Sequence, residues 1–163
     1  MPVIVSVGCV TKILLSLHVL VAILAVGPVA VAASRFPPAL RAAAAAPGDE
    51  TAVASLRTLY RICRVYALIG IAVPVFGFAT AGVMHVTGDT WVIVSIGLTA
   101  IAAAVLAFLV LPRQRAALAG IETRTAIAPA TGARIAMATG VFNLLWVAVT
   151  VLMIVRPGSS TNA

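Results

Sequence analysis

Four long runs of apolar residues divide the chain, and shorter segments rich in arginine, proline or small polar residues separate them. The runs cover about 11–33, 65–84, 91–111 and 135–155. Each holds roughly 20 residues, the length that a helix needs to cross a hydrocarbon core of about 30 Å. A backbone in lipid must satisfy its own hydrogen bonds, so the pattern predicts helices and no strands. We therefore expect an all-α membrane protein, a single domain over residues 1–163 built as a four-transmembrane-helix bundle.

Composition points to the same class of protein. Of the 163 residues, 63% are hydrophobic and 9% are charged, whereas a soluble domain has about 25% charged residues. The net charge of +7 comes mostly from arginines in two of the connecting segments. These arginines are not interleaved with aromatic residues as in a nucleic-acid-binding patch. We therefore expect the lipid bilayer, and no nucleic acid, as a partner.

The distribution of arginine predicts the orientation in the membrane. Arginines gather in segments 34–64 and 112–134, whereas the connection between the second and third runs has no Lys or Arg and one acidic residue, Asp89. The positive-inside rule makes both segments cytoplasmic loops and leaves both termini outside (N-out/C-out), in a multi-pass protein of the inner (plasma) membrane. A competing interpretation treats the first run as a signal peptide that is cleaved after the segment Ala30-Val31-Ala32.

The first arginine segment has two predicted parts. Pro37 and Pro38 are expected to end the first helix, and the alanine run after them to form a short interfacial helix. The second part is predicted to be a helix that starts in the cytoplasm and continues into the second span. Arg57, Arg61 and Arg64 share one face of it and form a predicted membrane-surface basic face for anionic headgroups. A solvated face without a specific lipid is the simpler interpretation.

Polar residues inside the spans are few, and His18 is the most unusual of them. It lies in "LLSLHVLVAILAVGPVAV", about 9 Å below the outer edge that Lys12 marks. His85 is expected at the outer end of the second span. Because neutral imidazoles bind haem iron and copper, His18 and His85 are the candidate cofactor-binding residues, for haem b or a copper ion. The alternative is a structural His18 that is hydrogen-bonded to a neighbouring helix.

Other intramembrane features indicate helix packing. Asn143, near the middle of the fourth span, is the predicted polar packing residue, since a buried amide commonly bonds across to another helix. Gly132, Ala136 and Gly140 repeat every four residues and allow another helix to approach closely. That partner is either a helix of the same bundle or a helix of a second copy.

Motifs of catalysis are missing from the sequence. The spans contain no Asp, Glu or Arg, and the chain has no glycine-rich phosphate loop, serine elbow or HExxH helix. We therefore expect no enzyme, no catalytic residues and no conventional metal site. Haem b and copper are the only cofactors that the histidines leave open.

The stretch around His18 also carries a family resemblance. It resembles the first helix of a bacterial family of four-helix integral membrane proteins of unknown function, with many actinobacterial members. "LYRICRVYALIGIAVPVFGFATAG" is similar to that family's second helix, and "DTWVIVSIGLTAIAAAVLAFLVLPRQRAAL" resembles its third, so that the resemblance covers about 14–118. The family is distantly similar to copper-resistance D-type membrane proteins, which implies a metal or haem role for His18. This chain lacks their additional spans, histidines and methionines.

Three functions follow as hypotheses. The first is a non-enzymatic accessory or scaffolding subunit, as a homo-oligomer or within a larger membrane complex. The second is a haem- or copper-binding redox or transport protein that uses His18. The third is a small oligomeric permease, in which Gly27-Pro28 and Pro74 bend the helices.

Overall fold

The computed structural model describes the backbone of residues 2–158 and the side chains from residue 8 onward. Its elements are, in order, α1 (Pro2–Ala45), α2 (Glu50–Ile69), α3 (Ala72–Val83), α4 (Thr90–Ala104), the π-helix η1 (Val105–Val110), α5 (Leu111–Glu122) and α6 (Thr131–Val155). The described part of the chain contains no strand. The predicted all-α class is therefore confirmed.

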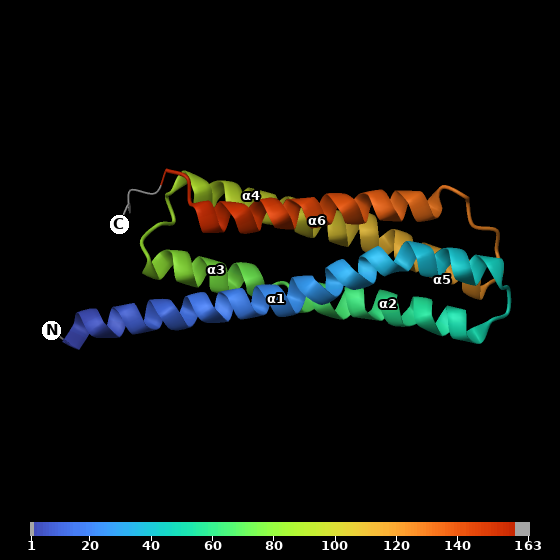
Figure 1. Ribbon diagram of the computed structural model, residues 1–163, viewed down its shortest axis with the longest axis horizontal. Helices are drawn as coiled ribbons and strands as arrows, with labels where there is room; N and C mark the ends of the chain where they lie inside the picture. Colours follow the sequence, from blue (N-terminus) through green and yellow to red (C-terminus); the bar gives the residue numbers. More distant parts are fainter. Residues whose placement is uncertain (1, 159–163) are drawn as a thin grey trace.

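These helices form four rods that lie side by side along the bundle (Figure 1). α1 is the first rod, α2 with α3 the second, α4 with η1 and α5 the third, and α6 the fourth. Each contains a segment long and apolar enough to cross a membrane, and these segments are Gly8–Ala45, Glu50–Val83, Thr90–Glu122 and Thr131–Val155. The chain is thus an integral membrane protein with four membrane-spanning helices. Both ends of its described part lie at the same end of the bundle (Figure 1).

The first helix does not end at Pro37 and Pro38, so that prediction is wrong. α1 continues through both prolines to Ala45. A proline inside a helix removes a hydrogen bond and costs about 3 kcal/mol or more. Packing offsets this cost, since Phe36 and Leu40 on adjacent turns are 0% and 4% exposed in a core shared with other rods. Burying one such side chain contributes about 1.5–3 kcal/mol.

The segments 34–64 and 112–134 are helical over most of their length. The helix predicted to lead into the second span is confirmed, since α2 begins at Glu50, whereas the extensions of α1 and α5 into these segments were not predicted. Only residues 46–49 and 123–130 connect the rods there. The 38 residues of Gly8–Ala45 make a helix of about 57 Å, well beyond a hydrocarbon core of about 30 Å. We call the end of the bundle where these extensions lie the arginine end; it carries Arg35, Arg41, Arg57, Arg61, Arg64, Arg113, Arg115, Arg124 and Arg134.

Two prolines explain the irregular points of the second and third rods. α2 ends just before Gly70, four residues ahead of Pro74, because the proline ring displaces the helical bond to that carbonyl. The amide of Val73 bonds to the Gly70 carbonyl instead, at 3.1 Å. In the third rod η1 precedes Pro112, and the amide of Leu111 reaches back five residues to the carbonyl of Leu106. Such π-turns add a residue where the regular ladder is interrupted.

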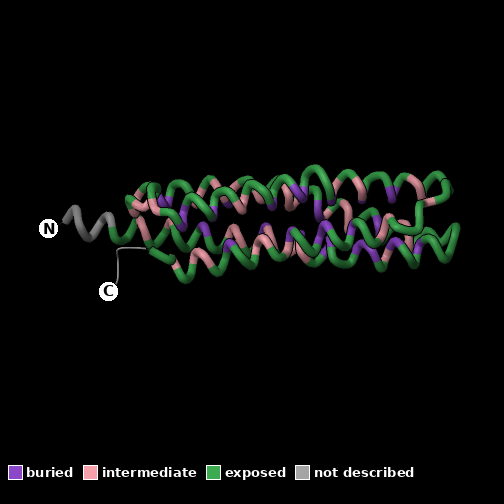
Figure 2. The backbone as a smooth tube through the Cα atoms, turned by 90° about the horizontal axis from the view of Figure 1, so that it is seen from above, coloured by how far each residue is buried: buried purple, intermediate pink, exposed green. Residues whose placement is uncertain are grey.

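Buried residues run along the inside of the bundle, while the outside is exposed (Figure 2). Three clusters make up the core. The central cluster joins α1, α2, α4, η1 and α6, and its buried members are Val29, Ala32, Ala33, Cys63, Ala102, Val105, Leu106, Val110, Ala138 and Phe142. A second cluster around Phe36 and Leu56 fills the arginine end. A small third cluster around Trp91 lies at the opposite end.

Candidate functional site

His18 lies between α1 and α3 and is 7% exposed. Its Nδ1 is 3.1 Å from the carbonyl oxygen of Val73. A carbonyl oxygen only accepts hydrogen bonds, so Nδ1 carries the proton and donates it. The imidazole therefore links two rods through one intramembrane hydrogen bond.

Gly77 provides the space for this imidazole. It lies one turn after Val73 on α3, and a Cβ placed on it would come 3.0 Å from Cε1 of His18. A side chain at position 77 would therefore require the ring to shift by at least a few tenths of an ångström. Glycine thus lets α1 and α3 approach closely at the level of the histidine.

The structure does not bring His85 to His18. His85 is exposed in the turn after α3, with a left-handed backbone at φ 55°. It follows Gly77 by eight residues, a rise of about 12 Å along a helix, whereas the ring of His18 packs on Gly77 itself. The two imidazoles therefore lie at different levels of the bundle, and a haem or copper site at His18 and His85 stays a prediction. No group of three or more His, Cys, Asp or Glu side chains lies together among the described residues.

Asn143 connects α6 with α1. Its Nδ2 donates to Oγ of Ser34 at 3.3 Å. Asn143 stands out in the sequence but Ser34 does not, because Ser34 lies in a segment that is expected to be a loop. Three buried polar atoms on the same face of α6 have no hydrogen-bond partner among the described residues: Thr139 Oγ1, Asn143 Oδ1 and Trp146 Nε1. The polar contacts between these two helices are thus incomplete.

Gln114 is a second buried amide that does not stand out in the sequence, since it too lies in a segment that was expected to be a loop. It is 0% exposed on α5, and its Nε2 lies 3.7 Å from Sγ of Cys63 on α2. Its Oε1 is buried without a partner. A thiol is a weak partner, so the amide keeps an unsatisfied polar atom in either orientation.

Replacing Gln114 by leucine should leave the protein as stable as before, or more stable by up to about 1 kcal/mol, because the change removes an unpaired buried acceptor. Gln114→Glu should cost about 3 kcal/mol or more, because it leaves a charge or an unpaired acid in the same place. Unfolding of the purified protein in mixed micelles at neutral pH measures both. Equal destabilisation by the two variants would contradict this account of Gln114.

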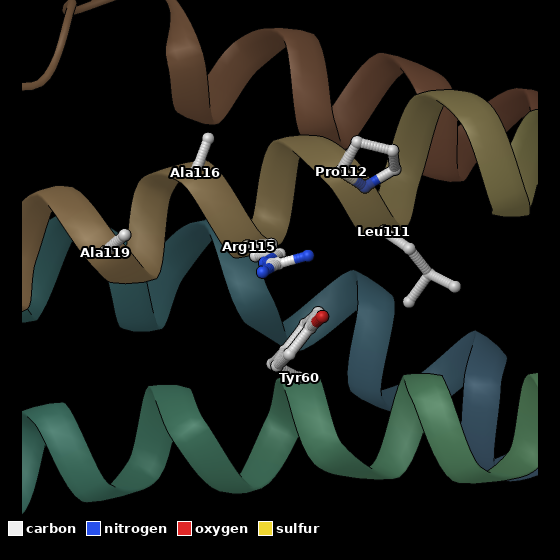
Figure 3. A pocket seen from close by; sticks show the side chains of 6 residues that line it. All are labelled: Tyr60, Leu111, Pro112, Arg115, Ala116 and Ala119. Atoms are coloured by element: carbon white, nitrogen blue, oxygen red, sulfur yellow. The ribbon is translucent and has the colours of Figure 1, made fainter.

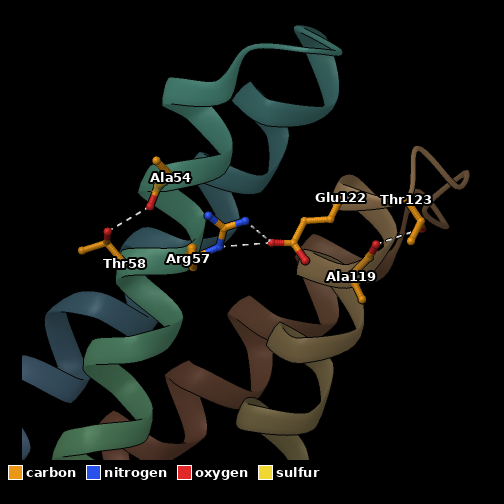
Figure 4. Close-up of polar contacts among 6 residues, drawn as sticks. All are labelled: Ala54, Arg57, Thr58, Ala119, Glu122 and Thr123. Atoms are coloured by element: carbon orange, nitrogen blue, oxygen red, sulfur yellow. Dashed lines mark hydrogen bonds and ion pairs between the residues drawn. The ribbon is translucent and has the colours of Figure 1, made fainter.

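The predicted basic face of α2 is divided by an ion pair. Arg57 donates to Oε1 of Glu122 on α5, from Nε at 3.2 Å and from Nη2 at 2.6 Å (Figure 4). This is the one salt bridge found in the described part of the chain. Arg61 and Arg64 are exposed and have no acidic partner there. Arg57 therefore ties two helices together, and only the other two remain available to headgroups.

The small residues of α6 face away from the bundle. Gly132, Ala136 and Gly140, which we call the α6 track, are intermediate or exposed. A Cβ on either glycine would meet nothing within 4 Å. The bundle therefore does not use the track for its own packing, contrary to the simpler of the two sequence expectations. Beside it, Met137 and Leu144 are 73% and 70% exposed.

A hollow of about 490 Å³ adjoins this track at the arginine end. Its walls come from α1, from the connection between α5 and α6, and from the first turns of α6. The lining residues are Pro37, Leu40, Arg41, Ala44, Ile127, Ala128, Pro129, Gly132, Ala133 and Ala136. The outer surface formed by α1 and α6 is thus hollowed beside Gly132 and Ala136.

The polar side chains of His18 and Asn143 each connect two helices of the same bundle. The one side-chain hydrogen bond of His18 and the one of Asn143 end on the chain's own backbone or side chains. Comparison with family models, with curated proteins and with solved structures finds no match to this chain. The resemblance to a bacterial four-helix family therefore stays a prediction, and the proposals below rest on the structure alone.

Proposed function

We propose that the protein is a non-enzymatic membrane subunit that acts by assembly, and that the α6 track binds the same track of a second copy. The observation that carries this proposal is the outward position of Gly132, Ala136 and Gly140. Lipid tails are as apolar as side chains, so helices in a membrane associate chiefly where small residues let their backbones come close. A track that its own bundle leaves free is suited to that contact.

A second copy is the occupant that this surface fits best. A row of small residues at four-residue intervals is self-complementary, since two such rows can cross and place backbone against backbone. The symmetric dimer that results is the commonest arrangement of homo-oligomers. The projecting side chains of Met137 and Leu144 can pack beside the crossing point. The adjoining hollow leaves room for the partner's helix end.

The proposal includes an orientation in the membrane. All arginines except Arg156 belong to the arginine end, and the positive-inside rule assigns such an end to the cytoplasm of a cell with an inner membrane. Copies inserted in this way share one orientation. Their α6 helices can therefore meet as parallel neighbours at the same depth.

Gly140→Leu should reduce dimer formation at least about tenfold, because the new side chain holds the two backbones apart and a tenfold change needs only about 1.4 kcal/mol. Gly97→Leu is the matched control: Gly97 on α4 is also exposed, with nothing within 4 Å of its Cβ position. The monomer–dimer equilibrium is measured by analytical ultracentrifugation in density-matched detergent and by photobleaching steps in liposomes. A wild-type chain that stays monomeric at every concentration, or equal dimer formation by Gly140→Leu and wild type, would refute the proposal.

A further inference from the structure

A groove between α2 and α5 brings an arginine and a tyrosine together at the arginine end. Arg115 of α5 and Tyr60 of α2 point toward each other across the space between the two helices (Figure 3). The groove has a volume of about 450 Å³, and its remaining walls are apolar: Leu111, Pro112, Ala116 and Ala119. None of these residues belongs to the α6 track.

The depth of this groove in the membrane follows from the length of the third rod. Trp91 marks the opposite end of that rod, and Leu111 follows it by 20 residues, a rise of about 30 Å. This rise equals the thickness of a hydrocarbon core. Leu111 therefore lies at the edge of the hydrocarbon, and Arg115 one turn further out, at the level of the lipid headgroups.

The charge in the groove is positive and is not neutralised by the protein. Arg115 is exposed and makes no hydrogen bond or ion pair with the described residues. Arg64 lies one turn from Tyr60 on the same face of α2 and is also exposed. The pair between Arg57 and Glu122 lies about one turn beyond Tyr60 and Ala119, on the side away from the membrane, and holds α2 and α5 together there. An anion can therefore enter from the lipid side.

We propose that this groove binds the phosphate of an anionic phospholipid. The guanidinium of Arg115 offers paired donors to two phosphate oxygens, and the Tyr60 hydroxyl can donate to the same group. Leu111 and Pro112 lie on the membrane side, where the glycerol and the first acyl carbons would contact them. The groove favours a lipid over a free phosphate ion because its apolar residues contact the acyl chains while Arg115 binds the phosphate. This inference needs only membrane insertion and is independent of the α6 dimer.

Native mass spectrometry of the full-length protein, with defined lipids added to detergent micelles, tests this proposal. The probes are phosphatidylglycerol, phosphatidylcholine with the same acyl chains, and inorganic phosphate. We expect one phosphatidylglycerol to bind preferentially, and Arg115→Gln to weaken its binding about tenfold, as loss of a charge-assisted contact does. Tyr60→Phe, which removes only a hydroxyl, should weaken it by a smaller factor. Arg134→Gln is the matched control: it removes the same charge from the arginine end, outside the groove.

Three results would overturn the proposal. Equal weakening by Arg115→Gln and Arg134→Gln would mean that only the total charge of this end attracts the lipid. Equal binding of phosphatidylcholine would show that the headgroup charge is not recognised. Displacement of the lipid by millimolar inorganic phosphate would make this a site for a free anion. Thermal unfolding of each variant, compared with wild type, separates loss of the site from loss of the fold.

Discussion

The Phe36→Ala variant should lose about 3–5 kcal/mol of unfolding free energy, the cost of truncating a fully buried phenylalanine. Phe36 is 0% exposed and packs in the cluster of the arginine end with Leu40, Leu56 and Ile135. Those residues come from three different rods, so the truncation leaves a cavity where the rods meet. The same contacts stabilise α1 where it continues through Pro37 and Pro38. The loss should therefore be accompanied by fraying of α1 beyond this point.

Phe108→Ala is the matched control for this prediction. Phe108 lies in η1 and is 77% exposed, so in the membrane its ring faces lipid and leaves no protein cavity when removed. Equilibrium unfolding in mixed micelles gives both free energies, and hydrogen exchange of the backbone amides of residues 39–45 reports the fraying. If the two phenylalanine variants were equally stable, the arginine end would not contain the packed core described above.

Gly77→Val should destabilise the protein by about 1–3 kcal/mol, the usual cost of overpacking a close contact. Even the Cβ would lie 3.0 Å from Cε1 of His18, and the two methyl groups of valine need more room than that. The ring must then leave the Val73 carbonyl, and α1 and α3 must separate. Combining Gly77→Val with His18→Ala should recover part of the loss, because the smaller side chain frees the space.

Gly82→Val provides the comparison, since Gly82 lies on the same helix with nothing within 4 Å of its Cβ position. Any cost of placing a branched residue in α3 is common to both variants, and the difference isolates the contact with the histidine. A double-mutant cycle of wild type, His18→Ala, Gly77→Val and the double variant measures the coupling between positions 18 and 77. Additive effects would show that His18 does not rest on this glycine.

The elements themselves were predictable to different degrees. The four spans follow from hydropathy, which sums the transfer free energies of neighbouring side chains and needs no knowledge of distant contacts. Of the helical extensions at the arginine end, that of α2 follows from the sequence, whereas those of α1 and α5 were expected to be loops. Arginines and prolines lower local hydropathy and helix propensity, yet a polar stretch becomes helical when one of its faces, such as that of Phe36 and Leu40, finds a core. That core exists only after folding.

In the candidate sites, too, some residues could be predicted from the sequence and their partners could not. His18 and Asn143 stand out in the sequence because polar residues are rare in a span. Their partners do not: Val73 follows His18 by 55 residues and Ser34 precedes Asn143 by 109. Arg115 and Tyr60 were not selected at all, since neither is unusual at a membrane surface. Their shared groove arises because α2 and α5 pack side by side.

The sequence by itself determined the class of protein, the number of spans and the concentration of arginine at one end. These properties depend on local composition measured against the thickness and polarity of a bilayer. Only the tertiary structure decided which way the small residues of α6 face, where His18 donates its proton and which arginine pairs with an acidic residue. Each of these depends on the rotation of one helix against another. That rotation is set by side-chain packing between segments far apart in the chain, which hydropathy does not contain.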